Sequence, residues 1–362
     1  LNFKGSAENT AFANYQRFMN NKQEQMNELR NQMQQSQGDE NKEKEITEKI
    51  NALDKEVKAY WDKVIDENPN TFFANIIKSL KPIEFPEFDI PDDASNADSL
   101  RWIMSYQYNQ NHFFDNIDLT DSRFIRTPFF QSKIDTYFDK ILAPIPDTII
   151  TYSDKLIERV KGNENMFQYI VSHLFSKYQN SAIMGMDAVF VHLAEKYYLS
   201  GEMKGISDDL KKRITDRVAD LKPNLLGQIA PNVSMRDSNN RLQELHAVNA
   251  QVTIVYFWEP GCSHCRKVTP LLRDLYKKYN EKGMSVFAVY TQGEQEKWLE
   301  YIKDNELTWI NVWDPYRLTN YHKLYDIYST PILYVLDKDK KIIAKRIGIE
   351  SLERFIEQEL GI

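Results

Sequence analysis

The sequence contains two cysteines, Cys262 and Cys265, which are three residues apart. A disulfide stabilises a fold mainly by restricting a long loop of the unfolded chain, so a bond across this short loop would add little stability. Secreted proteins that depend on disulfides usually have more cysteines, spaced far apart. The pair is therefore predicted to perform chemistry, and thiols at this spacing can exchange with a disulfide of another molecule.

The residues around the pair predict how it would react. A strand-like run, 252–258, comes before it, and a helical pattern begins at about Cys262. Both sulfurs are therefore expected in the first turn of a helix, where free N–H groups and the helix dipole stabilise a thiolate. Cys262 is expected to attack a substrate disulfide and Cys265 to resolve the mixed disulfide. His264 is expected to lower the pKa of Cys262 through its positive charge or a hydrogen bond.

A single C-x-x-C pair also forms half of many zinc sites. The sequence has no second cysteine pair, and its six histidines show no H-x₃₋₅-H spacing. We therefore expect no metal site, and no cofactor other than a redox-active Cys262–Cys265 disulfide. Two alternatives remain open: a carrier of copper or another thiophilic metal that uses both cysteines and His264, and a client-binding protein whose cysteine pair only makes binding redox-sensitive.

The C-terminal third alternates strands with helices. Strands are expected at 252–258, 284–290, 310–312, 332–336 and 342–346. Helices are expected at 262–282, 294–304, 316–325 and 350–360. The first two strands are continuous apolar runs, which are typical of strands buried on both faces. This order of elements predicts a mixed sheet flanked by helices.

The upstream two thirds are expected to be helical. Two polar stretches, 6–37 and 41–66, carry apolar residues at helical spacing around a turn at Gly38 and Asp39, which predicts a helical hairpin. Aromatic-rich helical patterns follow at 98–114, 129–142, 147–161, 164–179, 183–199 and 207–221. The expected domains are a hairpin over 1–66, an all-helical domain over 67–223 and the mixed-sheet domain over 224–362.

Composition argues against nucleic acid as a partner and against a membrane-spanning helix. Residues 225–362 carry equal numbers of acidic and basic side chains, so the net charge of −7 falls on the upstream part. Nucleic-acid binding needs clustered Lys and Arg, and no such partner is expected. No apolar run approaches the roughly 20 residues of a membrane-spanning helix. Because the first residue is Leu rather than Met, we expect a signal or lipid-anchor segment to be missing from this sequence.

The C-terminal motifs together resemble the thioredoxin superfamily, in particular its exported TlpA/ResA-like branch. Trp258 stands four residues before the first cysteine, and Pro270 stands five after the second, as in that family. Thr330 and Pro331 precede a strand at the place of the family's cis-proline loop, and residues 227–235 resemble the N-terminal hairpin of the branch.

This resemblance implies a thioredoxin fold after the helical region, and thiol–disulfide oxidoreductase activity with Cys262 and Cys265 as catalytic residues. It implies that Thr330 and Pro331 form a cis bond beside the cysteines and bind substrate through their backbone. Trp258 and Pro270 would have structural roles near the site.

Three positions depart from the family pattern. Tyr256 stands where thioredoxin has a buried Asp that accepts the proton of the second cysteine. Val268 stands where some TlpA/ResA-like proteins carry a Glu, and Gly261 replaces an exposed Trp before the first cysteine. The proton acceptor is therefore left open among Glu259, water and the substrate. The loss of the Trp predicts a flatter, less apolar rim around Cys262.

The upstream region has a resemblance of its own. Residues 112–128 are similar to a helical module that precedes the thioredoxin domain in some cell-envelope thiol–disulfide interchange proteins of Gram-negative bacteria. Residues 1–9 resemble the exit from an N-terminal β domain. The resemblance implies a place in the periplasm or cell envelope, with a membrane tether through the missing N-terminus. The implied partners are protein thiols or disulfides and an upstream thiol–disulfide electron donor, and the implied activity is that of a reductase or interchange enzyme.

Overall fold

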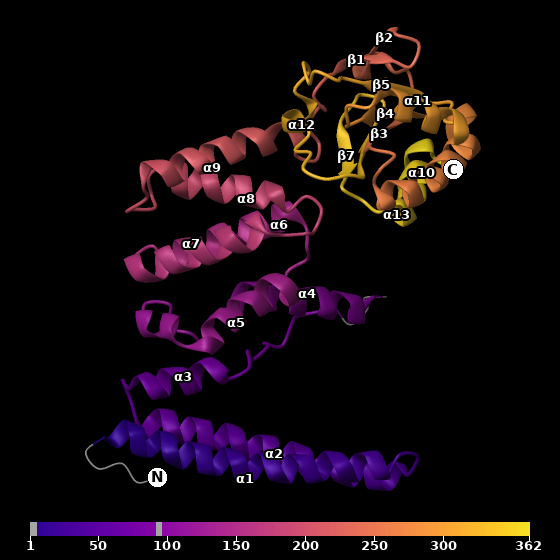
Figure 1. The fold of residues 1–362 in the computed structure, drawn as a ribbon. Coiled ribbons are helices and arrows are strands. Elements are labelled where there is room, and N and C mark those ends of the chain that lie inside the picture. Colours follow the sequence, from indigo (N-terminus) through magenta and orange to yellow (C-terminus); the bar gives the residue numbers. More distant parts are fainter. Residues whose placement is uncertain (1–5, 92–95) are drawn as a thin grey trace. The chain divides into compact units, whose positions relative to one another are not determined.

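The computed structural model describes residues 6–91 and 96–362 (Figure 1). Most of the segment 1–9, which resembles the exit from a β domain, lies outside these residues. The chain divides into two compact units: residues 1–143 with 158–167, and residues 144–157 with 168–362. The described residues confirm a helical N-terminal region followed by a mixed sheet flanked by helices.

The first two helices form the expected hairpin. Helix α1 is Ala7–Gln35 and helix α2 is Glu40–Glu67. Asp39 is the N-cap of α2, and its side chain accepts a hydrogen bond from the backbone N–H of Lys42. Such a cap satisfies one of the free N–H groups of the first turn. The turn before it contains Gly38 at φ +92°, a conformation in which glycine meets no steric penalty.

The rest of the N-terminal region consists of short helices. They are α3 Phe72–Leu80, α4 Ala97–His112, a 3₁₀ turn Ser122–Arg126, α5 Pro128–Thr136, α6 Pro146–Val160, α7 Glu164–Gln179, α8 Asp187–Leu193 and α9 Asp208–Leu221. All six expected helices are present, but two of them, α5 and α8, continue into π-helical turns at Tyr137–Ile141 and Ala194–Leu199. Helix α3 has nine residues, which is too short for its period to stand out in the sequence.

The sheet has seven strands in the order β2-β1-β5-β4-β3-β6-β7 (Figure 1). The strands are β1 Ser234–Asp237, β2 Leu242–Glu244, β3 Val252–Trp258, β4 Met284–Tyr290, β5 Ile310–Trp313, β6 Ile332–Leu336 and β7 Ile342–Lys345. Strands β3, β4 and β5 are parallel, and the other pairings are antiparallel. Four helices accompany the sheet: α10 Ser263–Tyr279, α11 Gln295–Asp304, α12 Tyr321–Leu324 and α13 Ile349–Leu360.

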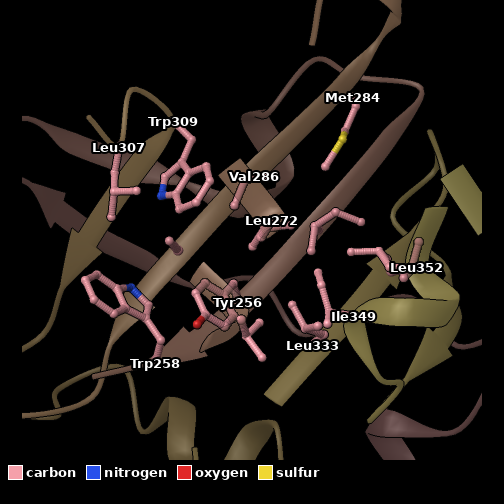
Figure 2. Close-up of a cluster of buried hydrophobic side chains, with 14 of the residues drawn as sticks. Tyr256, Trp258, Leu272, Met284, Val286, Leu307, Trp309, Leu333, Ile349 and Leu352 are labelled. Carbon is pink, nitrogen blue, oxygen red and sulfur yellow. The ribbon is translucent and has the colours of Figure 1, made fainter. Parts of the chain in front are cut away.

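Apolar side chains cover both faces of the sheet, which explains the continuous apolar runs. Every residue of β3 is buried. Tyr256 and Trp258 point to one face, where they pack with Leu272 of α10 and Leu352 of α13 (Figure 2). Side chains between them, such as Phe257, belong to a separate cluster on the opposite face. Because both faces are covered, the strand shows none of the alternation of a half-exposed strand.

The prediction of a helix over 316–325 is mostly wrong. The segment 316–325 contains only the four-residue helix α12. The side chain of Asp314 accepts hydrogen bonds from the backbone N–H groups of Leu318 and Thr319, 3.0 and 2.7 Å away. Arg317 also has a positive φ of 51°. These N–H groups are held in a turn by a carboxylate, and turns of this kind compete with helix formation.

Within the second unit, buried ionic contacts connect α8 and α9 to the sheet. Asp326 is 2% exposed and pairs with Arg217 of α9 and with Arg346, which follows β7. Lys345, at the end of β7, pairs with Asp187 of α8. Across the described residues, no helix has the length and apolar character needed to cross a membrane.

Candidate active site

The cysteine pair lies where β3 ends and α10 begins. Cys262 is the N-cap residue of α10, with extended backbone angles of φ −76° and ψ 122°. Its Sγ accepts a hydrogen bond from the backbone N–H of Cys265 at 3.3 Å. The N–H groups of a first helical turn have no partner within the helix, so they are free to bind a sulfur at this position. Both cysteines are free thiols.

The two thiols differ in exposure and acidity. Cys262 is half-buried, which alone would disfavour its thiolate, but the backbone N–H groups of Cys265 and His264 hold its pKa below the ordinary value. Cys265 is 1% exposed, and burial raises its pKa to about 12. One sulfur is therefore suited to be a nucleophile near neutral pH, whereas its neighbour stays protonated.

The loop before β6 lies beside the thiols. Strand β6 pairs antiparallel with β3, and Phe257 is opposite Ile332, so the residues that precede β6 reach the end of β3. The Thr330–Pro331 bond is cis, as the resemblance implies. The Cys262 thiol donates a hydrogen bond to the carbonyl oxygen of Thr330 at 3.4 Å. The register of two strands thus brings together residues that are 68 positions apart.

The other three expected site residues, His264, Trp258 and Pro270, each lie in a different environment. The ring of His264 is exposed to solvent, and what this residue supplies to Cys262 is its backbone N–H. Trp258 is fully buried, with its ring 5.2 Å from that of Tyr301. Pro270 lies inside α10, where a residue without an N–H cannot complete the helical hydrogen-bond pattern. The effect of the His264 ring on the pKa of Cys262 stays a prediction.

The positions that depart from the family pattern lie close to Cys265. Tyr256 is fully buried, and burial raises its pKa well above the ordinary value. Its hydroxyl is 2.9 Å from Oγ1 of Thr269, which in turn donates to the carbonyl oxygen of Cys265. Val268 is buried and has no group that binds a proton. Neither residue can therefore accept the proton of Cys265 near neutral pH.

One contact of the site was not predicted from the sequence. Oγ1 of Thr330 donates a hydrogen bond of 2.8 Å to Oε1 of Glu259, the residue that directly follows β3. The sequence offers Glu259 as one possible proton acceptor and Thr330 as part of the substrate-binding loop, and it does not link the two. The contact depends on the pairing of β3 with β6, and the sequence alone does not fix that register.

Two families match the chain. A domain of unknown function (DUF5106) matches residues 28–224, which is more than half of the chain. The chain belongs to this family. The thioredoxin-like family matches residues 249–342. Together they confirm a thioredoxin-like domain that is preceded by a DUF5106 domain.

A curated relative and a solved structure are each similar to the C-terminal part of this chain. The thiol–disulfide oxidoreductase ResA of Bacillus cereus is 27% identical over 139 residues, which are 38% of this chain and 78% of the relative. A domain of a possible thiol–disulfide isomerase from Cytophaga hutchinsonii is 44% identical, with a TM-score of 0.35, over 37% of this chain and 92% of that one.

A third similar protein extends over the helical region. A thioredoxin-like protein from Bacteroides caccae covers 77% of this chain and 99% of its own, with 21% identity and a TM-score of 0.58. At this identity the likeness shows the fold alone, and it confirms the order of a helical region and a thioredoxin fold. The DUF5106 chain is thus a thiol–disulfide oxidoreductase of the ResA/TlpA type, with a C-x-x-C pair at Cys262 and Cys265.

Proposed function

We propose that this protein exchanges thiols with the disulfides of other proteins in the cell envelope, as a reductase or interchange enzyme. The observation that carries the proposal is the contrast between two sulfurs three residues apart. Cys262 lies at a helix N-terminus with a lowered pKa, and Cys265 is buried behind it with a raised one. A reactive thiolate next to a protected thiol is the arrangement that disulfide exchange requires.

The proposed reaction has two steps. The thiolate of Cys262 attacks one sulfur of a substrate disulfide, and the other substrate sulfur leaves as a thiolate. Cys265 then attacks the sulfur of Cys262, the mixed disulfide breaks, and the reduced substrate is released. The pair ends as a Cys262–Cys265 disulfide, so a further thiol donor must return it to the reduced form.

The surface around the nucleophile supports a protein-sized substrate. A Cβ added at Gly261 would meet no atom within 4 Å, so the surface beside the thiol is open. Tyr328, two residues before Thr330, is 78% exposed and offers an aromatic ring to a partner. An extended substrate segment could pair with the backbone of Thr330 and Pro331, as implied by the family resemblance. The envelope location likewise rests on the resemblance to the TlpA/ResA-like branch.

Reduction of insulin by dithiothreitol tests the proposal. The full chain should accelerate the reaction, and Cys262→Ser should return it to the rate without protein. Cys265→Ser should instead accumulate a mixed disulfide with insulin, because the first attack remains and resolution is lost. A wild-type rate no faster than the blank would contradict catalysis and favour a redox-sensitive binding protein.

Iodoacetamide alkylation at different pH values tests the nucleophile directly. Because the pKa of Cys262 is lowered, its alkylation rate should reach half of the maximum at a pH below about 8.5, the pKa of an ordinary thiol. The His264→Gln variant measures what the ring contributes. A midpoint for wild type at or above that of a free cysteine would contradict the assignment of Cys262.

A redox titration of the cysteine pair determines the direction of exchange. A potential near that of thioredoxin, about −270 mV, supports a reductase, whereas a potential near about −120 mV indicates an oxidant.

A further inference from the structure

The second step of the proposed reaction needs a proton acceptor. Cys265 must lose its proton to attack the sulfur of Cys262, and burial raises its pKa to about 12. At neutral pH an unassisted thiol of this kind is ionised in roughly one molecule in 10⁵. The two positions that could carry an acceptor by family resemblance hold Tyr256 and Val268, which cannot serve.

A carboxylate reaches the thiols through a hydroxyl group. Oγ1 of Thr330 donates to Oε1 of Glu259 at 2.8 Å. The side chain of Thr330 also lowers the pKa of both Cys262 and Cys265. The carbonyl oxygen of Thr330 independently fixes the Cys262 thiol at 3.4 Å. Thr330 therefore links the nucleophile to the carboxylate through hydrogen bonds, and its side chain favours the thiolate of the resolving cysteine.

We propose, building on the proposed function, that Glu259 is the proton acceptor for Cys265 and that the hydroxyl of Thr330 relays the proton between them. As Cys265 attacks, its thiol proton passes to Oγ1 of Thr330, while the hydroxyl proton of Thr330 passes to Oε1 of Glu259. A bond forms between the sulfurs of Cys265 and Cys262, and the bond from Cys262 to the substrate sulfur breaks. The substrate leaves as a thiolate, and Glu259 is left neutral until it returns the proton to solvent.

The other titratable groups nearby do not compete for this proton. Tyr256 of β3 and Tyr301 of α11 face Cys265, and Tyr290 of β4 faces Glu259. Burial raises the pKa of all three tyrosines above the ordinary value, so they stay neutral over the range in which the enzyme is assayed. Over that range the pH dependence of the second step should therefore report on the cysteine pair and Glu259. The exposed ring of His264 also lies nearby, so the His264→Gln variant serves as a control for it.

Stopped-flow reaction of the reduced full chain with 5,5′-dithiobis(2-nitrobenzoate) separates the two steps. Attack by Cys262 releases one equivalent of coloured thiolate, and attack by Cys265 on the mixed disulfide releases the second. The readout is the rate of the second phase relative to the first, from pH 5.5 to 9.5. Glu259→Gln should lower this ratio between about tenfold and a hundredfold at pH 7, and should move the midpoint of the second phase to higher pH.

Variants at Thr330 test the relay itself. Thr330→Val keeps the shape of the side chain but removes the hydroxyl, and it should slow the second phase as much as Glu259→Gln. Thr330→Ser returns the hydroxyl and should restore the phase. The double variant Glu259→Gln/Thr330→Val should be no slower than either single variant, because both interrupt one pathway. Circular dichroism confirms that each variant is folded.

Controls keep this proposal separate from the proposed function. Glu296→Gln, an exposed position on α11, should behave as wild type, and His264→Gln should retain the pH dependence of the second phase. A second phase that is unchanged in Glu259→Gln at every pH would overturn the relay and leave the solvent or the departing thiolate as acceptor. The proposed function would stand in that case, since it fails only if the wild-type chain shows no second equivalent or no insulin reduction.

Discussion

The helical hairpin and the sheet domain differ in how deeply they bury their side chains. Helix α1 has 29 residues and none of them is buried, whereas all seven residues of β3 are buried. The hairpin carries its charges on exposed surfaces, such as the pair Lys58–Asp54. In the second unit Asp326, which pairs with Arg217 and Arg346, is buried, with 2% of its surface exposed. The number of ion pairs is therefore a poor guide to what stabilises each region, and burial is the better one.

The largest difference should appear when an aromatic ring is removed from each region. Phe287 in β4 is fully buried, so Phe287→Ala should lower the free energy of unfolding by about 3–5 kcal/mol. Phe12 in α1 is 43% exposed and meets the ring of Phe73 at 5.6 Å, so Phe12→Ala should cost about 1 kcal/mol. Urea denaturation of the full chain measures both. Equal losses would contradict the contrast between the regions.

The next largest effect is expected at the buried carboxylate. Asp326→Asn keeps the shape of the side chain but leaves Arg217 and Arg346 without their shared counter-charge. Because both guanidinium groups are partly exposed, we expect a loss of about 2–3 kcal/mol, below the value for a fully buried pair. Urea denaturation at pH 7 checks this value. A loss below about 0.5 kcal/mol would show that solvent replaces the carboxylate easily.

A pH-dependent effect is expected at Asp154 of α6. Partial burial disfavours its charged form, but hydrogen bonds from His192, Lys196 and Tyr197 outweigh this and lower its pKa to about 2. A carboxylate with a lowered pKa adds stability above the unfolded-state pKa, near pH 4, and loses it as the pH falls toward 2.

Asp154→Asn should therefore cost about 1–2 kcal/mol at pH 7, after allowance for partial exposure. The gap between wild type and variant should narrow between pH 4 and pH 2. Urea denaturation at pH 7, 4 and 2.5 measures it. A gap that stays constant with pH would mean that the hydrogen bonds do not depend on the charge of Asp154.

The smallest effect is expected in the hairpin. Asp54 pairs with Lys58 one helical turn away, and both side chains are about half exposed. Asp54→Asn should change the free energy of unfolding by less than about 0.5 kcal/mol, and salt should reduce the difference further. Denaturation in low and high salt tests this. A loss as large as that in Asp326→Asn would remove the distinction between exposed and buried pairs.

The sequence predicted those parts of the fold that depend on local pattern. The apolar runs 252–258 and 284–290 became β3 and β4, because strands buried on both faces have no polar positions. The hairpin followed from its helical periodicity and the turn at Gly38. The C-x-x-C spacing and its flanking patterns placed the cysteines at the start of α10, whereas the position of Thr330 and Pro331 beside them was implied by the family resemblance.

Other features depend on partners far along the chain. Asp314 captures backbone N–H groups and limits α12, although the segment has helical periodicity. Asp326 lies 109 positions from Arg217, so no pattern in the sequence indicates their pairing. The same holds for Glu259 and Thr330, which meet only because β3 and β6 are neighbours in the sheet. These contacts of Asp314, Asp326 and Glu259 are what the sequence did not predict.

Because Cys265 is buried, the number of thiols that react also reports how often this part of the structure opens. A thiol reagent that cannot resolve into a disulfide, such as a maleimide, should modify one equivalent per folded chain, because the second sulfur is 1% exposed. Two equivalents should react once the first turn of α10 detaches from the sheet. Counting labels by mass spectrometry would then show how often this end of the helix opens, without any added probe.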